Sequence, residues 1–113
     1  MPVKVNEMAG KLSLRVNTTK GDLDRDVTGC YISDLLSDVM ANAQEGEVWI
    51  TLQTHPNIVA VAVLKNLSGI IITNNRNPEG ETLKKAEAEG IPIMLSASST
   101  FETGGSLYRL LRC

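Results

Sequence analysis

The second half of the chain alternates continuous apolar runs with segments of helical periodicity. A continuous apolar run is typical of a strand covered on both faces, because neither side of such a strand meets water. Strands of this kind are predicted at 48–52, 69–73 and 93–95. Helices are predicted at 58–67, at 78–89 and in the segment after 100. This alternation is typical of right-handed crossovers in a parallel sheet with helices on both faces.

The first half is predicted to hold two helices and two further strands. A short helix is expected at 6–10, and strands at 12–16 and 27–32. The clearest helix follows Ser33–Asp34, which could cap it, and continues to Gly46, which could end it. Its apolar face is formed by Leu35, Leu36, Val39, Met40 and Ala43.

These elements predict an α/β fold with three layers, α/β/α, in a single domain over residues 1–113. The central sheet is expected to be mainly parallel, and the two early strands could join it as a mixed edge. Helix 58–67 is apolar nearly all round, so it must be buried on more than one side. The sequence leaves two ways to bury it, namely the sheet with a neighbouring helix, or a second subunit.

Composition and charge exclude several classes of function. The 113 residues carry a formal net charge of −2, with scattered basic residues and 4% aromatic residues, so nucleic-acid binding is not expected. The apolar run 58–64 is too short to cross a bilayer, and no apolar signal segment opens the chain, which predicts a cytoplasmic protein. Cys30, Cys113 and His55 are too few for a disulfide framework, a zinc site or an iron–sulfur cluster. No metal or cofactor is therefore expected.

The loops that follow the three buried strands are the expected ligand site. Ligands of open parallel sheets collect at the carboxyl ends of the strands, and helix N-termini there favour phosphate or carboxylate groups. The loops 53–57, 74–78 and 97–100 are rich in hydroxyl and amide side chains. The candidate ligand-binding residues are Thr54, His55, Asn57, Thr73, Asn74, Asn75, Arg76, Ser98, Ser99 and Thr100.

Each candidate also has a purely structural interpretation. His55 could contact an anion or act as an acid–base group, or it could only hold a turn. The segment 74–77 could hold a phosphate through Arg76, or it could simply form a turn. Ser98–Thr100 could cap the last helix. No carboxylate pair, nucleophile–base pair or metal-ligand spacing is present, so no catalytic residue is predicted, and Cys30 is expected to be a small core residue.

Several segments together resemble the DRTGG domain family. They are 27–34, 49–62, 69–73, 86–95 and 99–103, and the resemblance extends over about residues 5–111. It implies the fold of the HPr kinase N-terminal domain and a regulatory or assembly module, commonly dimeric, with no established activity. Family members occur beside CBS domains in some pyrophosphatases. Small stand-alone versions are encoded near iron-only hydrogenase and redox-signalling genes of anaerobic bacteria.

The sequence departs from the motif that names the family. Thr54–His55 stand where the Asp-Arg pair is expected, and Thr73–Asn74–Asn75 stand for Thr-Gly-Gly. The contiguous segment 24–29 resembles the motif but lies in the wrong part of the domain.

The expected function is a non-catalytic, homodimeric regulatory module for a small anionic ligand, such as a nucleotide or phosphometabolite, in hydrogenase-linked anaerobic metabolism. The alternatives are a structural adaptor for a redox complex, with a redox protein as partner, and a small phosphotransfer enzyme. The enzyme would use His55 and would need Asp34 or Glu102 within hydrogen-bond reach.

Overall fold

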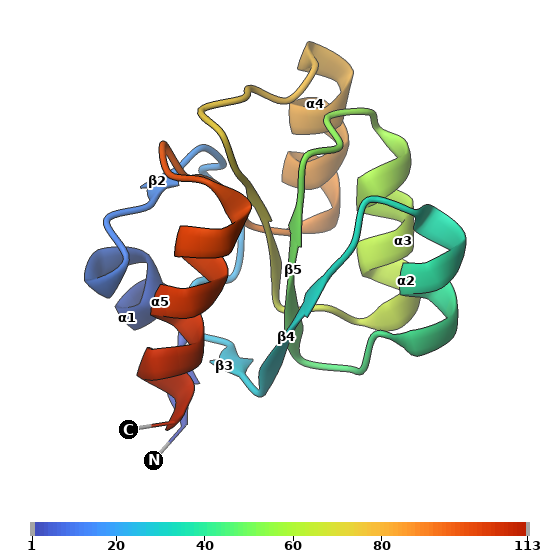
Figure 1. Ribbon diagram of the computed structural model, residues 1–113. Helices are drawn as coiled ribbons and strands as arrows, with labels where there is room; N and C mark the ends of the chain where they lie inside the picture. Colours follow the sequence, from blue (N-terminus) through green and yellow to red (C-terminus); the bar gives the residue numbers. More distant parts are fainter. Residues whose placement is uncertain (1, 113) are drawn as a thin grey trace.

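A five-stranded sheet forms the middle layer of the protein, in the strand order β2-β7-β6-β5-β4 (Figure 1). The computed structural model describes residues 2–112. The strands are β2 (Arg15–Val16), β4 (Gly29–Ile32), β5 (Glu47–Thr51), β6 (Gly69–Ile72) and β7 (Ile93–Leu95). Strands β4 to β7 are parallel, and β2 pairs antiparallel with β7. The predicted mainly parallel sheet with a mixed edge is therefore confirmed.

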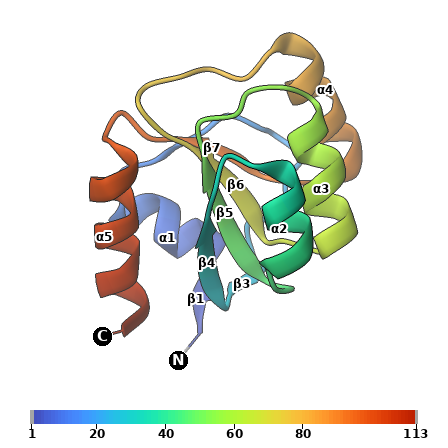
Figure 2. The ribbon, with the colours of Figure 1, turned by 45° about the vertical axis from the view of Figure 1, so that its right-hand side comes forward.

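Helices cover both faces of this sheet (Figure 2). One face packs against α2 (Leu36–Asn42), α3 (Asn57–Lys65) and α4 (Gly80–Glu89). The other face packs against α1 (Val5–Lys11) and α5 (Thr100–Arg112). A small separate ribbon pairs β1 (Val3–Lys4) with β3 (Asp26–Val27). This arrangement is the predicted α/β/α fold.

Successive residues of the central strands point to opposite layers, and both layers are apolar. In β6, Ile70 and Ile72 belong to the core under α2, α3 and α4, whereas Ile71 belongs to the core under α1 and α5. All four residues of β6 are buried. The continuous apolar runs in the sequence are explained by this burial on both sides.

Helix α3 is buried by the sheet and by its neighbours α2 and α4. Ile58 and Ala62 are fully buried, whereas Val63 and Leu64 at its end are exposed. Of the two ways to bury this helix, the sheet with neighbouring helices is the one that the structure shows, and the fold does not require a second subunit here. No helix within residues 2–112 is both long and apolar enough to cross a membrane.

The two early strands are shorter than predicted, for local reasons, whereas the first helix, predicted at 6–10, is longer and spans Val5–Lys11. The expected strand 12–16 is reduced to Arg15–Val16 because Ser13 has a left-handed backbone, with φ 54°. The expected strand 27–32 is divided at Thr28 between β3 and β4, which belong to different sheets.

Two helix boundaries also differ from the prediction. Helix α2 begins at Leu36 and ends at Asn42, because Leu35 before it and Ala43 after it have extended backbones. Helix α4 begins at Gly80, two residues after Pro78, because Glu79 is also extended.

Candidate functional site

The topology singles out the loops after β6 and β7. Strands β4, β5, β6 and β7 are consecutive neighbours, and the helices that connect them, α2, α3 and α4, lie on one face. After β7 the chain crosses to the other face and forms α5. The loops leaving β6 and β7 therefore run to opposite faces. In open α/β sheets, ligands bind in the crevice that such a change of direction creates.

In this protein that crevice is closed by hydrogen bonds between the two loops. The Asn74 N–H donates to the Ser98 carbonyl at 2.9 Å, and the Asn75 N–H donates to the Ser96 carbonyl at 2.9 Å. Below them, the hydroxyls of the buried Thr73 and of Thr100 lie 2.7 Å apart. Asn74 and Asn75 both have left-handed backbones, with φ 60° and 57°. Asparagine tolerates this conformation better than other non-glycine residues.

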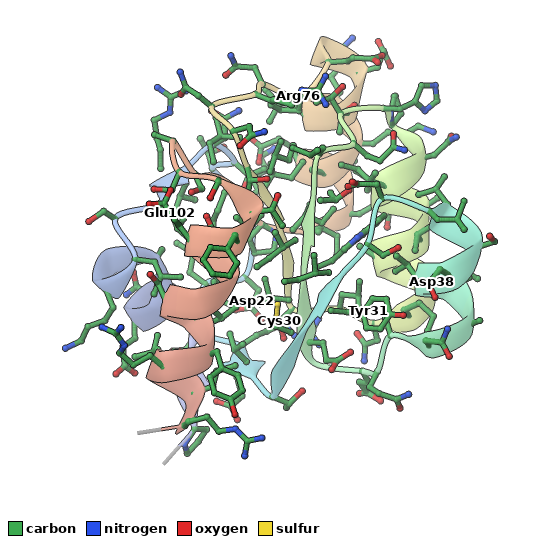
Figure 3. The ribbon with its side chains drawn as sticks, in the orientation of Figure 1. Asp22, Cys30, Tyr31, Asp38, Arg76 and Glu102 are labelled. Carbon is green, nitrogen blue, oxygen red and sulfur yellow. The ribbon has the colours of Figure 1, made fainter. Side chains whose placement is uncertain are left out.

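The start of α5 is capped by its own side chains. The Ser99 hydroxyl accepts the Glu102 N–H at 3.1 Å, and Glu102 Oε1 lies 3.4 Å from the Ser99 nitrogen and 3.2 Å from the Ser99 hydroxyl. This reciprocal pair is a capping box. The Thr103 hydroxyl bonds to the Ser99 carbonyl and to the Ser96 hydroxyl. Glu102 thus lies beside the helix start (Figure 3), where an anionic ligand would otherwise bind.

Asp34 organises the loop after β5, a role that its sequence position did not indicate. Its Oδ1 accepts the Thr51 hydroxyl at 2.8 Å and the Leu52 N–H at 2.7 Å. Its carbonyl accepts the Gln53 side-chain amide at 2.9 Å. The carboxylate is therefore directed at β5 and does not cap α2. From the next loop, the Arg76 guanidinium donates to the Leu52 carbonyl at 2.9 Å.

Thr54 and His55 are held by local contacts. The Thr54 carbonyl accepts the Glu79 N–H at 3.1 Å and the Thr82 hydroxyl at 2.7 Å, which ties this loop to the start of α4. His55 Nδ1 accepts the Asn57 N–H at 3.1 Å, so a neutral His55 carries its proton on Nε2. Asn57 is the first residue of α3, so this helix begins one residue before the predicted start at 58.

Within the described residues 2–112, no carboxylate is hydrogen-bonded to His55 as an acid–base partner. Among residues 2–112, neither Asp34 nor Glu102 forms a hydrogen bond with it, since Asp34 is bonded to β5 and Glu102 to Ser99. The same described residues contain no group of three or more His, Cys, Asp or Glu side chains that could hold a metal ion.

Six of the ten predicted site residues are exposed along this edge of the sheet. We call them the polar rim: His55, Asn57, Asn74, Asn75, Arg76 and Ser98. Thr54, Ser99 and Thr100 are half-buried beneath the polar rim, and Thr73 is buried. Within residues 2–112, the side chains of Asn57, Asn74, Asn75 and Ser98 form no hydrogen bond, and the guanidinium of Arg76 forms one. The closed crevice thus presents a rigid backbone with unpaired polar side chains.

Sequence reasoning did not identify the polar cluster between β4 and α2. The Tyr31 hydroxyl lies 2.9 Å from both carboxylate oxygens of Asp38, and Asn42 donates to the same carboxylate (Figure 3). The hydrogen bond to Asp38 raises the pKa of Tyr31. A Tyr seven residues before an Asp is too common a spacing to signal this contact.

Comparison with known proteins decides the family. The model of the DRTGG domain matches residues 7–110, which is nearly the whole chain. The chain belongs to the DRTGG domain family. The predicted resemblance is therefore confirmed, despite the changes at 54–55 and 74–75.

One solved structure shows the same fold in a larger DRTGG protein. It is the crystal structure of the CBS and DRTGG domains of the regulatory region of Clostridium perfringens pyrophosphatase, complexed with an activator, diadenosine tetraphosphate. The TM-score is 0.74 at 14% sequence identity, over 93% of this DRTGG chain and 46% of the other chain. This chain therefore spans less than half of that structure, and the likeness is one of fold. No curated protein matches the sequence.

Proposed function

We propose that this DRTGG chain is a non-catalytic regulatory module that binds a small anionic ligand, a nucleotide or a phosphorylated metabolite, at the polar rim. The observation that carries the proposal is the closed crevice between the β6 and β7 loops. It holds the backbones of Asn74, Asn75 and Ser98 in place and leaves their side chains exposed and unpaired within residues 2–112. A preorganised set of donors loses little conformational entropy when a ligand binds.

The donors of the polar rim suit an anion. Arg76 uses one guanidinium N–H on the Leu52 carbonyl, which fixes the side chain and leaves four N–H donors. The amides of Asn74 and Asn75 add further donors, and the Nε2 of His55 adds one more. Because Glu102 lies at the start of α5, the ligand would contact the 74–76 loop and not that helix N-terminus.

A regulatory role is favoured over phosphotransfer because the nearby carboxylates already have partners. Asp34 and Glu102 were the candidate partners of His55, and both are engaged elsewhere. A nucleotide is the first ligand to test, since the regulatory region of the pyrophosphatase binds diadenosine tetraphosphate. The proposal rests on the polar rim, because that structure is more than twice as long as this chain.

Thermal unfolding with added ligands tests the proposal. Diadenosine tetraphosphate, ATP, AMP and inorganic phosphate are titrated separately, and a ligand at about 100 times its Kd adds about 2.7 kcal/mol, which raises Tm by about 10 °C. Arg76→Ala and His55→Ala are expected to reduce this shift and to lower the Tm of the free protein by only a few degrees, since each exposed side chain loses one hydrogen bond.

Lys84→Ala is the matched control, because it removes an exposed cation from α4, away from the polar rim. A nucleotide shift that all three variants retain would place the ligand elsewhere and contradict the proposed site. The absence of any shift with all four ligands would contradict the ligand-binding role for these ligand classes.

The cellular setting is also part of the proposal. We place this module in the cytoplasm, in anaerobic metabolism linked to hydrogenase, where it would sense the ligand or, as the alternative, act as an adaptor in a redox complex. This setting is supported by the family resemblance alone. Affinity purification of the tagged chain from its native cells tests it, and recovery of no redox protein would count against the setting.

A further inference from the structure

Exposed apolar side chains gather where α5 crosses the edge strand β4. Phe101 is 88% exposed, Tyr108 is 63% exposed and Ile32 of β4 is 49% exposed. Phe101, Gly105, Tyr108 and Arg112 are spaced by four, three and four residues, so they lie along one face of α5, which we call the α5 stripe. Contiguous exposed apolar patches mark interaction surfaces, and aromatic side chains are enriched in protein interfaces.

A cavity of about 450 Å³ lies beside the C-terminal half of the α5 stripe. Among its lining residues are Cys30, Ile32, Gly104, Tyr108, Leu111 and Arg112. The Arg112 guanidinium lies 5.2 Å from the centre of the Tyr108 ring at its border. Gly104 leaves room for the Ile32 side chain between α5 and β4, because a Cβ at that position would lie 2.9 Å from Cδ1 of Ile32 and the Ile32 side chain would have to shift. The surface therefore has the projecting ring of Phe101 at the N-terminal end of α5 and the cavity at its C-terminal end.

We propose that a second copy of this chain occupies this surface, with the two α5 helices packed antiparallel across a two-fold axis. The midpoint of the α5 stripe falls between Gly105 and Tyr108. A two-fold axis there sets Tyr108 of each copy on Gly105 of the other. It also sets Phe101 of each copy, about 16 Å along the helix from Arg112, against the cavity and the Arg112 guanidinium of the other copy. Each copy fills the cavity of its partner, as an isologous interface requires.

The charges on α5 favour the antiparallel orientation. Glu102 lies in the first turn of α5, whereas Arg109 and Arg112 lie in its last turn. Antiparallel packing brings the acidic end of each helix beside the basic end of the other, and parallel packing would oppose like charges. The two helix dipoles are also opposed in the antiparallel arrangement. Glu102 and Arg109 are seven residues apart, so they flank the α5 stripe on the same side, where antiparallel helices exchange ion pairs.

Gly105, which has no side chain, leaves room on the α5 stripe for the close approach of another helix. A Cβ added at Gly105 would meet nothing within 4 Å, so the fold of a single copy does not need a glycine there. A glycine inside a helix lowers its stability. In the proposed dimer the missing side chain has a use, because it leaves room for the Tyr108 ring of the other copy.

Sedimentation velocity of the full chain over a range of micromolar concentrations tests the proposal. The wild-type protein is expected to change from monomer to dimer, and added salt should weaken the association through the Glu102–Arg109 pairs. Phe101→Ala is expected to raise the dimer Kd by about tenfold or more, as truncation of a buried aromatic anchor does. Since Phe101 is exposed in one copy, the Tm of the dilute monomer should stay the same.

Leu64→Ala on α3 is the matched control, because Leu64 is 70% exposed on the opposite face of the sheet. It is expected to leave the dimer Kd unchanged. Gly105→Gln is expected to weaken the dimer while the monomer keeps or raises its Tm. Arg109→Glu should weaken the dimer. The addition of Glu102→Gln, which can keep the capping box and removes the repelling charge, should recover part of the affinity.

Three results would overturn the proposal. The first is a wild-type chain that remains monomeric at every concentration. The second is a dimer that Leu64→Ala weakens and Phe101→Ala does not, which would place the interface on α3. The third is a dimer for which adding Glu102→Gln to Arg109→Glu recovers none of the lost affinity. None of these measurements uses a ligand, so they are independent of the proposed function.

Discussion

Replacing Thr73 by Val tests whether the crevice between the β6 and β7 loops is held closed by side chains. Valine keeps the shape of Thr73 and removes only its hydroxyl, which lies 2.7 Å from the hydroxyl of Thr100. A hydrogen bond of this kind contributes about 1 kcal/mol net, because the alternative partner is water. For 113 residues this loss corresponds to a Tm lower by about 4 °C.

Thr100→Val should lower the free energy of unfolding more than Thr73→Val does, if the burial of the remaining hydroxyl decides the loss. It leaves the hydroxyl of Thr73, which is fully buried, without its partner, whereas Thr100 is half-buried and can turn to water. The double variant removes both hydroxyls and leaves none unpaired, so its stability should lie close to that of the wild type. The two substitutions are therefore expected to be strongly non-additive.

Urea unfolding of the four proteins provides the assay. The free energies of unfolding form a double-mutant cycle, and the expected coupling is about 2 kcal/mol or more, because both single losses disappear in the double variant. A cycle in which the two losses simply add would show that the hydroxyls do not interact. Single variants as stable as the wild type would show that the pair does not hold the crevice closed.

Two further predictions concern titratable groups. The backbone N–H groups of Thr19 and Lys20 donate to the Glu87 carboxylate and lower its pKa below the ordinary value of 4.5. This contact therefore stabilises the fold above about pH 4.5 and is lost as the pH falls further. Glu87→Gln should therefore lower Tm at neutral pH and have progressively less effect below pH 4.5, whereas the exposed control Glu89→Gln should not show this trend; an equal loss at all pH values would refute the assignment. Burial, with the nearby charge of Glu47, raises the pKa of the Cys30 thiol to about 12. In a Cys113→Ser protein, iodoacetamide at pH 8 should therefore modify Cys30 at least a hundredfold more slowly in the folded than in the urea-unfolded state, and equal rates would contradict the burial.

The central elements could be predicted because their local pattern agrees with their final environment. The runs at 48–52, 69–73 and 93–95 are apolar throughout, and the sheet does bury both faces of these strands. Strands β2 and β3 have two residues each, which is too short for a hydrophobic period to show. Their extent depends on the left-handed backbone of Ser13 and on the change of sheet at Thr28, neither of which the pattern contains.

The position of the candidate site could be predicted, but not its internal contacts. The rule that parallel sheets bind ligands at the carboxyl ends of their strands selects the three loops. The pairing of Asn74 with Ser98 and of Thr73 with Thr100 depends on which strands are neighbours and in what register, so the sequence alone could not show a closed crevice. Asp34 illustrates the same limit, since a residue well placed to cap α2 instead binds the backbone of Leu52, 18 positions later.

The exposure of Phe101 and Tyr108 could not be predicted either. The last helix shows an apolar face through Leu107, Leu110 and Leu111, and aromatic residues beside such a face are usually buried with it. Phe101 and Tyr108 are instead exposed, because the core under α5 is filled by other side chains, including Met94 and Leu107.

The layer formed by α1 and α5 is built from the two ends of the chain, whereas residues 29–95 alone form β4 to β7 and the three helices of the other layer (Figure 2). The middle segment can thus assemble from contacts between neighbours in sequence, and the two ends can close the second face only afterwards. Until they do, Val48, Ile50, Ile71 and Met94 face solvent on one side of the sheet. Loss of either end should therefore convert a stable protein into one that aggregates. In a hydrogen-exchange experiment, the backbone amides of α1 and α5 should exchange together, before those of β6.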